Sequence, residues 1–420
     1  MKKSLLITEN ALILFIAIML FGAFTSGTQA ILNIAAVLSL VLIIVLALHS
    51  PRSLYKHGNI LYQQNKLLLL SLIVFILWSM ICILFFTYKD QQRMALFQLC
   101  LDWRYALIVL FAGIILYHRN SSLQKAILIS FISTLGFIVF ISPLWQYFKV
   151  SDLPYYLSLR DGFAFYVVML APFLLTWGLR PKVKWYIYGF SVFTLLGAFL
   201  YLAFAGSRGG MLSLLLECLL GIFLLAPDKK TACYLCGKII IGMLLILLIA
   251  YLSFPQTRDK VRQSLHEQDL TSGRITIVAT RYPMIMNSIP HYLHGIGYDG
   301  ATYSLYLNDH HAPPAYIFKR EGNYIIYSND EPIFIRFLYN LGFIGLALFL
   351  WTLITMILVN WRNYKAYHHF FALGLLLSAV GYYLVFCQFE AVRMPSFFML
   401  LMITLLTNKS KEHEGAEGAA

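Results

Sequence analysis

The sequence predicts an all-α polytopic integral membrane protein with about twelve transmembrane helices. Apolar residues make up 60% of the 420 residues and charged residues only 12%, whereas a soluble domain carries about 25% charged residues. The chain is long enough for about a dozen spans of about 20 residues each. Strand-like alternation of apolar and polar residues is absent, which excludes an outer-membrane barrel.

Twelve apolar runs define the predicted helices. The first run follows Lys2 and Lys3, as in a signal peptide, but it lacks a convincing A-x-A cleavage site. A second apolar run follows at once, so we expect an uncleaved first helix. The predicted spans are 9–26, 30–49, 67–88, 103–117, 125–145, 163–179, 185–205, 210–226, 237–254, 333–360, 367–386 and 392–407.

The distribution of basic residues predicts that both termini face the cytoplasm. With the N-terminus inside, 17 of the 32 basic residues fall in cytoplasmic segments and seven fall in short outer loops. Cytoplasmic loops of membrane proteins carry an excess of Lys and Arg. Topology therefore accounts for most of the net charge of +13, and we expect no nucleic-acid partner.

One long polar segment divides the chain. Residues 255–331 hold five of the eleven histidines and eight of the nineteen acidic residues. A loop of this length is usually functional, and helical apolar spacing over 274–290 predicts an ordered periplasmic cap. The predicted organisation is helices one to nine in 1–254, the cap in 255–331, helices ten to twelve in 332–407 and a cytoplasmic tail in 408–420.

The stretch AFAGSRGGM contains the first candidate site. Ser207, Arg208 and Gly209 separate two apolar runs at the outer surface. An arginine flanked by glycines lets backbone amides and a guanidinium converge on one anion, which suits phosphate or pyrophosphate. The alternative is a tight interhelical turn whose arginine meets lipid headgroups.

Two candidates lie in and after the cap. Arg274 and Arg281 are seven residues apart, which places them on one helix face. They form either a second anion site or a solvated surface. Asp330 and Glu331 precede the return into the membrane. They are either helix-capping acids or a general base at the membrane boundary.

Weaker substrate-binding candidates lie in other outer segments. Arg160 neighbours Asp161 and could form a simple ion pair, and Arg393 lies in the last outer turn. His310 and His311 have no metal-ligand spacing, so we expect neither a metal nor a cofactor. Glu217 lies within an apolar run, where an acid is a functional candidate by default.

The chain resembles the bacterial O-antigen ligases, within the group that includes the O-antigen polymerases. The predicted topology is similar throughout. Local similarities are SRGG at 207–210, Arg274, the G-x-G turn at 295–297, the re-entry segment LYNLGFIG and the stretch GYYLVFCQFEAVRMP.

The resemblance implies a GT-C-like fold and a metal-independent, inverting glycosyltransferase of the inner membrane, with its active site facing the periplasm. The implied partners are a glycan carried on undecaprenyl pyrophosphate, a lipid A–core acceptor and membrane lipids. Arg208 and Arg274 match the positions that hold the pyrophosphate, with Arg281 and Arg160 as further candidates.

One position departs from the family pattern. The family carries a His–Asn pair eleven and ten residues before the glycine of the re-entry motif, whereas this chain has Glu331 and Pro332 before Gly342. Glu331, Asp330 and the loop histidines therefore compete as the general base. A polymerase that uses a second lipid-linked glycan as acceptor is the first alternative, followed by a transporter of the lipid-linked glycan and a structural scaffold.

Overall fold

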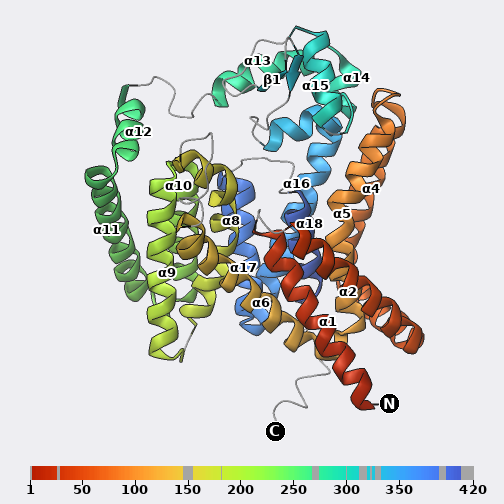
Figure 1. The fold of residues 1–420 in the computed structure, drawn as a ribbon, viewed down its shortest axis with the longest axis horizontal. Helices are drawn as coiled ribbons and strands as arrows, with labels where there is room; N and C mark the ends of the chain where they lie inside the picture. Colours follow the sequence, from red (N-terminus) through yellow and green to blue (C-terminus); the bar gives the residue numbers. More distant parts are fainter. Residues whose placement is uncertain are drawn as a thin grey trace.

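The computed structural model describes residues 2–25, 29–144, 155–180, 182–266, 274–298, 300–311, 319–321, 324–326, 333–386 and 394–407. Helices form one bundle, and a smaller group of helices with one hairpin covers one end of it (Figure 1). The N-terminus lies at the opposite end from this group. We call the covered end the outer end, following the predicted topology.

Nine helices in the described part of the chain are long and apolar enough to cross a membrane. The apolar stretches of three shorter helices coincide with the remaining three predicted spans. The structure thus confirms the all-α polytopic membrane class. The long elements are α1 (Lys2–Ala23), α2 (Gln29–His49), α4 (Lys66–Phe85), α5 (Gln92–Ile115), α6 (Asn120–Gly136) with η2 (Phe137–Ile141), α9 (Trp185–Phe204), α10 (Arg208–Leu225), α11 (Lys229–Ser253) and α16 (Ile333–Tyr367). The shorter stretches belong to α8 (Tyr155–Gly178), α17 (Phe370–Ser378) with η3 (Ala379–Phe386), and α18 (Met394–Leu405).

Two helices differ from the predicted boundaries. α5 begins at Gln92 rather than at 103, so Arg93 lies in a helix and not in a loop. The helix continues through MALFQLCL (94–101), between the polar positions Arg93 and Asp102 that suggested a break. The predicted inner loop between the second and third spans contains a further helix, α3 (Pro51–Gln64), which is amphipathic and packs against α5.

Helix α8 lies at the centre of the bundle. Every residue from Phe163 to Thr176 is buried, and α8 packs against α6, α9, α10 and α17. A helix that is hydrophobic all round belongs in a protein interior. In contrast, α2 and α11 expose large apolar side chains such as Ile34, Val37, Ile241 and Leu248, as expected for helices that face lipid.

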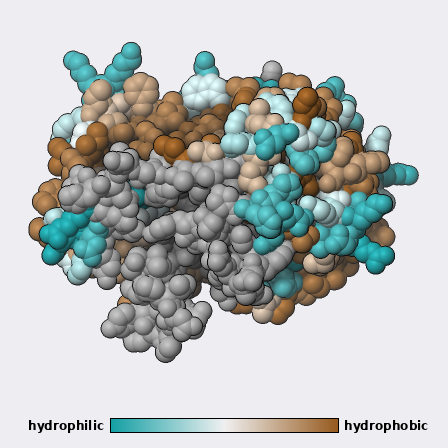
Figure 2. Space-filling view, turned by 90° about the horizontal axis from the view of Figure 1, so that it is seen from above, coloured by the Kyte–Doolittle hydropathy of each residue, from teal (hydrophilic) through white to brown (hydrophobic). Residues whose placement is uncertain are grey.

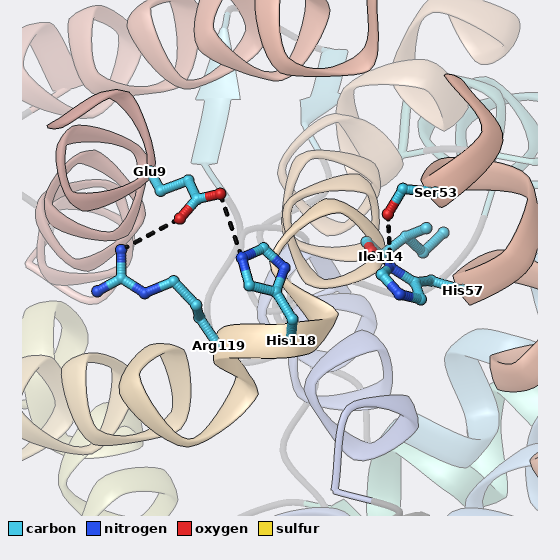
Figure 3. Close-up of polar contacts among 6 residues, drawn as sticks. All are labelled: Glu9, Ser53, His57, Ile114, His118 and Arg119. Atoms are coloured by element: carbon cyan, nitrogen blue, oxygen red, sulfur yellow. Dashed lines mark hydrogen bonds and ion pairs between the residues drawn. The ribbon is translucent and has the colours of Figure 1, made fainter. Parts of the chain in front are cut away.

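Polar contacts tie the helices together at the inner end (Figure 3). Glu9 of α1 binds Nε2 of His118 at 3.2 Å and Nη1 of Arg119 at 3.4 Å. His118 and Arg119 belong to η1 (Tyr117–Arg119), between α5 and α6. On α3, Nδ1 of His57 contacts the carbonyl oxygen of Ile114 at 3.2 Å, which holds α3 along α5.

Over its described residues, the covering group at the outer end, which we call the cap, contains four helices and a hairpin. These are α12 (Pro255–His266), α13 (Arg274–Met286), α14 (Ile289–His294), α15 (Gly300–Asp309) and the antiparallel strands β1 (Lys319–Glu321) and β2 (Tyr324–Ile326). The predicted helix in 274–290 is therefore confirmed as α13, although the hairpin was not predicted. Seen from above, hydrophilic residues gather on the right of this face, where Figure 1 places α14 and α15 (Figure 2).

Candidate active site

The Ser-Arg-Gly-Gly sequence lies where the sharp turn after α9 leads into α10, with Ser207 in the turn and Arg208 as the first residue of α10. Gly206 takes a positive φ of 65°, and Ser207 is the residue that precedes the first turn of α10. The Ser207 amide donates to the Leu202 carbonyl at 3.0 Å, and the Met211 amide donates to the Ser207 carbonyl at 3.0 Å. These bonds connect the turn to both helices, so its backbone is fixed.

The turn places a guanidinium beside the N-terminus of a long helix. Arg208 is the first residue of α10 and is partly buried, while Ser207 is buried and makes no capping hydrogen bond with its side chain. The first amides of a helix have no partner within the helix and carry partial positive charge. Gly209 adds no side chain that would block an approaching anion. Arg208, Ser207 and Gly209 therefore form a candidate phosphate-binding site.

The cap contacts this turn directly. The Thr257 hydroxyl of α12 donates to the Ala203 carbonyl at 3.4 Å, one residue before α9 ends at Phe204. At Gly210 an added Cβ would lie 2.7 Å from the Ser207 Oγ. The second glycine of the pair thus allows the first turn of α10 to pack against Ser207.

The other predicted anion-binding and catalytic residues cannot be placed by their side chains. The backbones of Arg160, Arg274 and Arg281 lie in α8 and α13, but their side chains lie outside the described part of the structure. Asp330, Glu331 and Arg393 lie outside the described residues altogether. Their roles remain predictions.

Two glycine motifs that are far apart in the sequence pack against each other. Gly295 of the G-x-G turn has φ 74°, and Gly342 interrupts α16 with φ 67° and ψ −171°. The Ile296 amide donates to the Tyr339 carbonyl at 2.7 Å. A Cβ on Gly342 would collide with the Leu293 carbonyl. The cap is therefore joined to α16 by backbone contacts that leave no space for a side chain.

A buried carboxylate holds the end of the same turn. The Tyr298 hydroxyl and the Gln98 side-chain amide each donate to Asp102 of α5 at 2.8 Å. The Tyr298 amide donates to the Thr87 hydroxyl at 3.1 Å. Asp102 carries no signal in the sequence, because a lone acid before an apolar run gives no motif. These contacts connect the cap to α5 as well as to α16.

A cavity of about 610 Å³ lies between the cap and the turn that joins α4 to α5. His310 lines it, whereas His311 is exposed, takes a positive φ of 47° and does not line it. Sequence reasoning missed the other lining residues, since they come from segments about two hundred positions apart. They are Leu84, Phe85, Phe86, Thr87, Tyr88, Lys89, Gln92, His291, Ile296 and Tyr306.

The described residues of these two sites offer oxygen and nitrogen groups for hydrogen bonding. Within the described ranges, no group of three His, Cys, Asp or Glu side chains could hold a metal ion. The predicted absence of a metal and of a cofactor remains a prediction. The described residues thus form a candidate anion site at Arg208 and a polar, aromatic cavity under the cap.

Together, the fold and these sites define a multi-pass α-helical membrane protein with a capped polar face at one end. Residues 192–350 match the family model described as O-Antigen ligase. This segment runs from α9 to α16 and includes the Ser207–Gly210 turn, the described cap and the Gly342 break. The match supports membership of the O-antigen ligase family, which confirms the resemblance found in the sequence. No curated protein matches the chain.

Proposed function

We propose that the protein transfers O-antigen polysaccharide from undecaprenyl pyrophosphate to a sugar hydroxyl of lipid A–core. The family match supports O-antigen ligase- or polymerase-type activity. The observation that carries the finer proposal is the turn at the start of α10, where Arg208 and the helix N-terminus lie together at the capped end of the bundle (Figure 1). On this proposal the enzyme resides in the inner membrane, crosses it twelve times and works on the periplasmic side.

The proposed reaction is a direct displacement. The acceptor hydroxyl oxygen attacks the anomeric carbon of the donor glycan, and the bond from that carbon to the pyrophosphate oxygen breaks. A base takes the hydroxyl proton. Arg208 and the amides at the start of α10 stabilise the negative charge that develops on the leaving undecaprenyl pyrophosphate. Arg274, Arg281, Arg160 and Arg393 are further candidates for binding the charged carrier.

Glu331 is the proposed base, because it occupies the position at which the family carries a histidine. Asp330, His310 and His311 are the alternatives. The base would act on a hydroxyl at the membrane boundary, where a carboxylate can bind and remove the proton. Glu331→Gln keeps the shape of the side chain and removes the base. Strongly slowed transfer in this variant would support Glu331, whereas a normal rate would assign the role to one of the alternatives.

The test is a lipopolysaccharide gel from cells that lack the gene and carry plasmid copies of variants. We expect Arg208→Ala to abolish transfer while the protein remains in the membrane, because loss of a partly buried charge contact costs about 2–5 kcal/mol. Arg362→Ala is the matched control, since Arg362 is an exposed arginine near the other end of α16. Full transfer by Arg208→Ala would contradict the assignment.

The same gel separates ligase from polymerase. Core without any O-antigen, with lipid-linked polymer accumulating, is the result expected for a ligase. Core that carries a single repeat unit would identify a polymerase with the same donor site. An unchanged ladder in the deletion strain would reject both.

A further inference from the structure

The cavity under the cap differs from the candidate phosphate site in place and in chemistry. It lies beside the α4–α5 turn and α14–α15, whereas Arg208 begins α10 on the other side of the outer end (Figure 1). Its volume of about 610 Å³ falls in the range of small-molecule sites. None of its lining residues takes part in the proposed handling of pyrophosphate, and only His310 has a second proposed role, as an alternative base.

Flat rings form much of the cavity wall. His310 stacks on Tyr306 with ring centroids 4.0 Å apart, and His291 meets the same tyrosine edge-on at 5.7 Å. Phe86 and Phe85 also line the cavity, and Phe86 stacks on His294 at 3.5 Å. Rigid amphipathic rings give a large contact area at little entropic cost. They suit the C–H face of a sugar ring.

The hydrogen-bonding groups complement hydroxyls. Nδ1 of His310 lies 3.0 Å from the Tyr306 carbonyl oxygen. A carbonyl oxygen only accepts, so Nδ1 carries the hydrogen of this bond, and Nε2 is the ring nitrogen that can meet a sugar hydroxyl. The Gln92 amide group donates to the Leu84 carbonyl at 3.0 Å, which fixes its orientation. The cavity thus offers both acceptors and donors, and hydroxyl groups use both.

The charge on the cavity wall is low. Burial, together with repulsion from His294 and His310, lowers the pKa of His291, so this ring is neutral near pH 7. Burial and then the nearby Asp309 raise the pKa of Tyr88 to about 12, and its hydroxyl donates to Asp309 at 3.2 Å. Lys89 is exposed. A highly charged pyrophosphate would find little opposite charge here to replace its hydration, whereas an uncharged saccharide needs none.

We propose that this cavity binds a saccharide unit of the acceptor and holds it for attack on the donor. The proposal rests on the proposed function, because it assigns the acceptor to one place in the same enzyme. Tyr306 and His310 provide the stacking surface, and His310 and Gln92 contact sugar hydroxyls. These residues set the specificity for the acceptor and not for the lipid-linked donor.

The kinetic test uses the full chain in detergent, lipid-linked donor, and lipid A–core extracted from the deletion strain. His310→Ala and Gln92→Ala should each raise the apparent KM for lipid A–core about tenfold, the effect of losing one net hydrogen bond. The KM for the donor should not change. Gln91→Ala is the matched control, because Gln91 is the neighbouring glutamine and does not line the cavity.

A binding test without turnover separates this proposal from the proposed function. Saturation-transfer NMR with deacylated core oligosaccharide should show sugar signals for the wild type and for Arg208→Ala. The signals should disappear in Gln92→Trp, whose side chain fills the cavity. Retention of the signals in Gln92→Trp, or a KM increase for the donor in His310→Ala, would overturn the proposal. Full transfer by Arg208→Ala would instead remove the proposed donor site and leave the sugar signals as support for the cavity.

Discussion

Replacing Gly342 by alanine tests whether the junction between the cap and α16 is as tight as the structure indicates. Gly342 has φ 67° and ψ −171°, a region that is essentially restricted to glycine and costs other residues about 1–3 kcal/mol. The new Cβ would also overlap the carbonyl of Leu293 and the amide of His294. Both neighbours are backbone atoms, so no side-chain rotation relieves the contact.

The expected loss of stability follows from these two contributions. Overpacking of a tight contact costs about 1–3 kcal/mol, which adds to the conformational cost, so Gly342→Ala should destabilise the protein by about 2–6 kcal/mol. The total stability of a domain is about 5–15 kcal/mol. The matched control is Gly242→Ala in α11, where an added Cβ meets nothing within 4 Å. This control should be neutral or gain up to about 1 kcal/mol.

Thermal unfolding in detergent measures the loss of stability of the whole protein, and hydrogen exchange measures the loosening at the junction itself. The Ile296 amide, which bonds to the Tyr339 carbonyl, should exchange faster in Gly342→Ala than in the wild type. Unchanged exchange together with a stability within about 0.5 kcal/mol of the wild type would refute the reasoning. A loss of similar size in Gly242→Ala would show that the effect is not specific to the junction.

Three further changes probe the other buried contacts. Tyr298→Phe should cost about 1–3 kcal/mol because Asp102 loses a buried donor, and a double-mutant cycle with Asp102→Asn should show coupling in unfolding experiments. Gly381→Ala should cost about 1–3 kcal/mol because its Cβ meets the buried carboxyl group of Glu217. Glu217→Ala should remove that added cost, and persistence of the cost would contradict the packing. Burial lowers the pKa of His294 below its ordinary 6.5, so the unfolded state takes up the proton first and stability should fall as the pH drops below about 6.5. A His294→Phe variant should show a smaller slope in melts recorded across this window, and an equal slope would reject the assignment.

The sequence predicted the helical bundle well because span length and apolarity are local properties. Within the described residues, each predicted segment overlaps an apolar helix, and nine of these helices are long enough to cross a membrane. The early start of α5 was missed because Arg93 and Asp102 interrupt the apolar run, although tertiary contacts such as that from Tyr298 satisfy Asp102. Local patterns do not report such contacts.

The site was harder to predict, because its parts come together only through the fold. The G-x-G turn and the re-entry glycine were each weak signals, yet Gly295 and Gly342 touch in the structure. The cavity joins Phe86 and Gln92 to His310, and only His310 carried a signal in the sequence. A pairing across so many positions cannot be read from periodicity or from a short motif.

The cap is fixed to the bundle at both sides, and this bears on the proposed reaction. On one side Thr257 bonds to the α9 segment beside the Arg208 turn. On the other side Tyr298 bonds to α5, and the Ile296 amide bonds to α16. The proposed donor and acceptor positions are thus connected through packed helices. An enzyme that joins two large lipid-anchored substrates gains most from fixed relative positions, because orientation supplies much of the rate enhancement of a two-substrate reaction. Loosening the junction at Gly342 should therefore slow transfer more than it weakens the binding of either substrate.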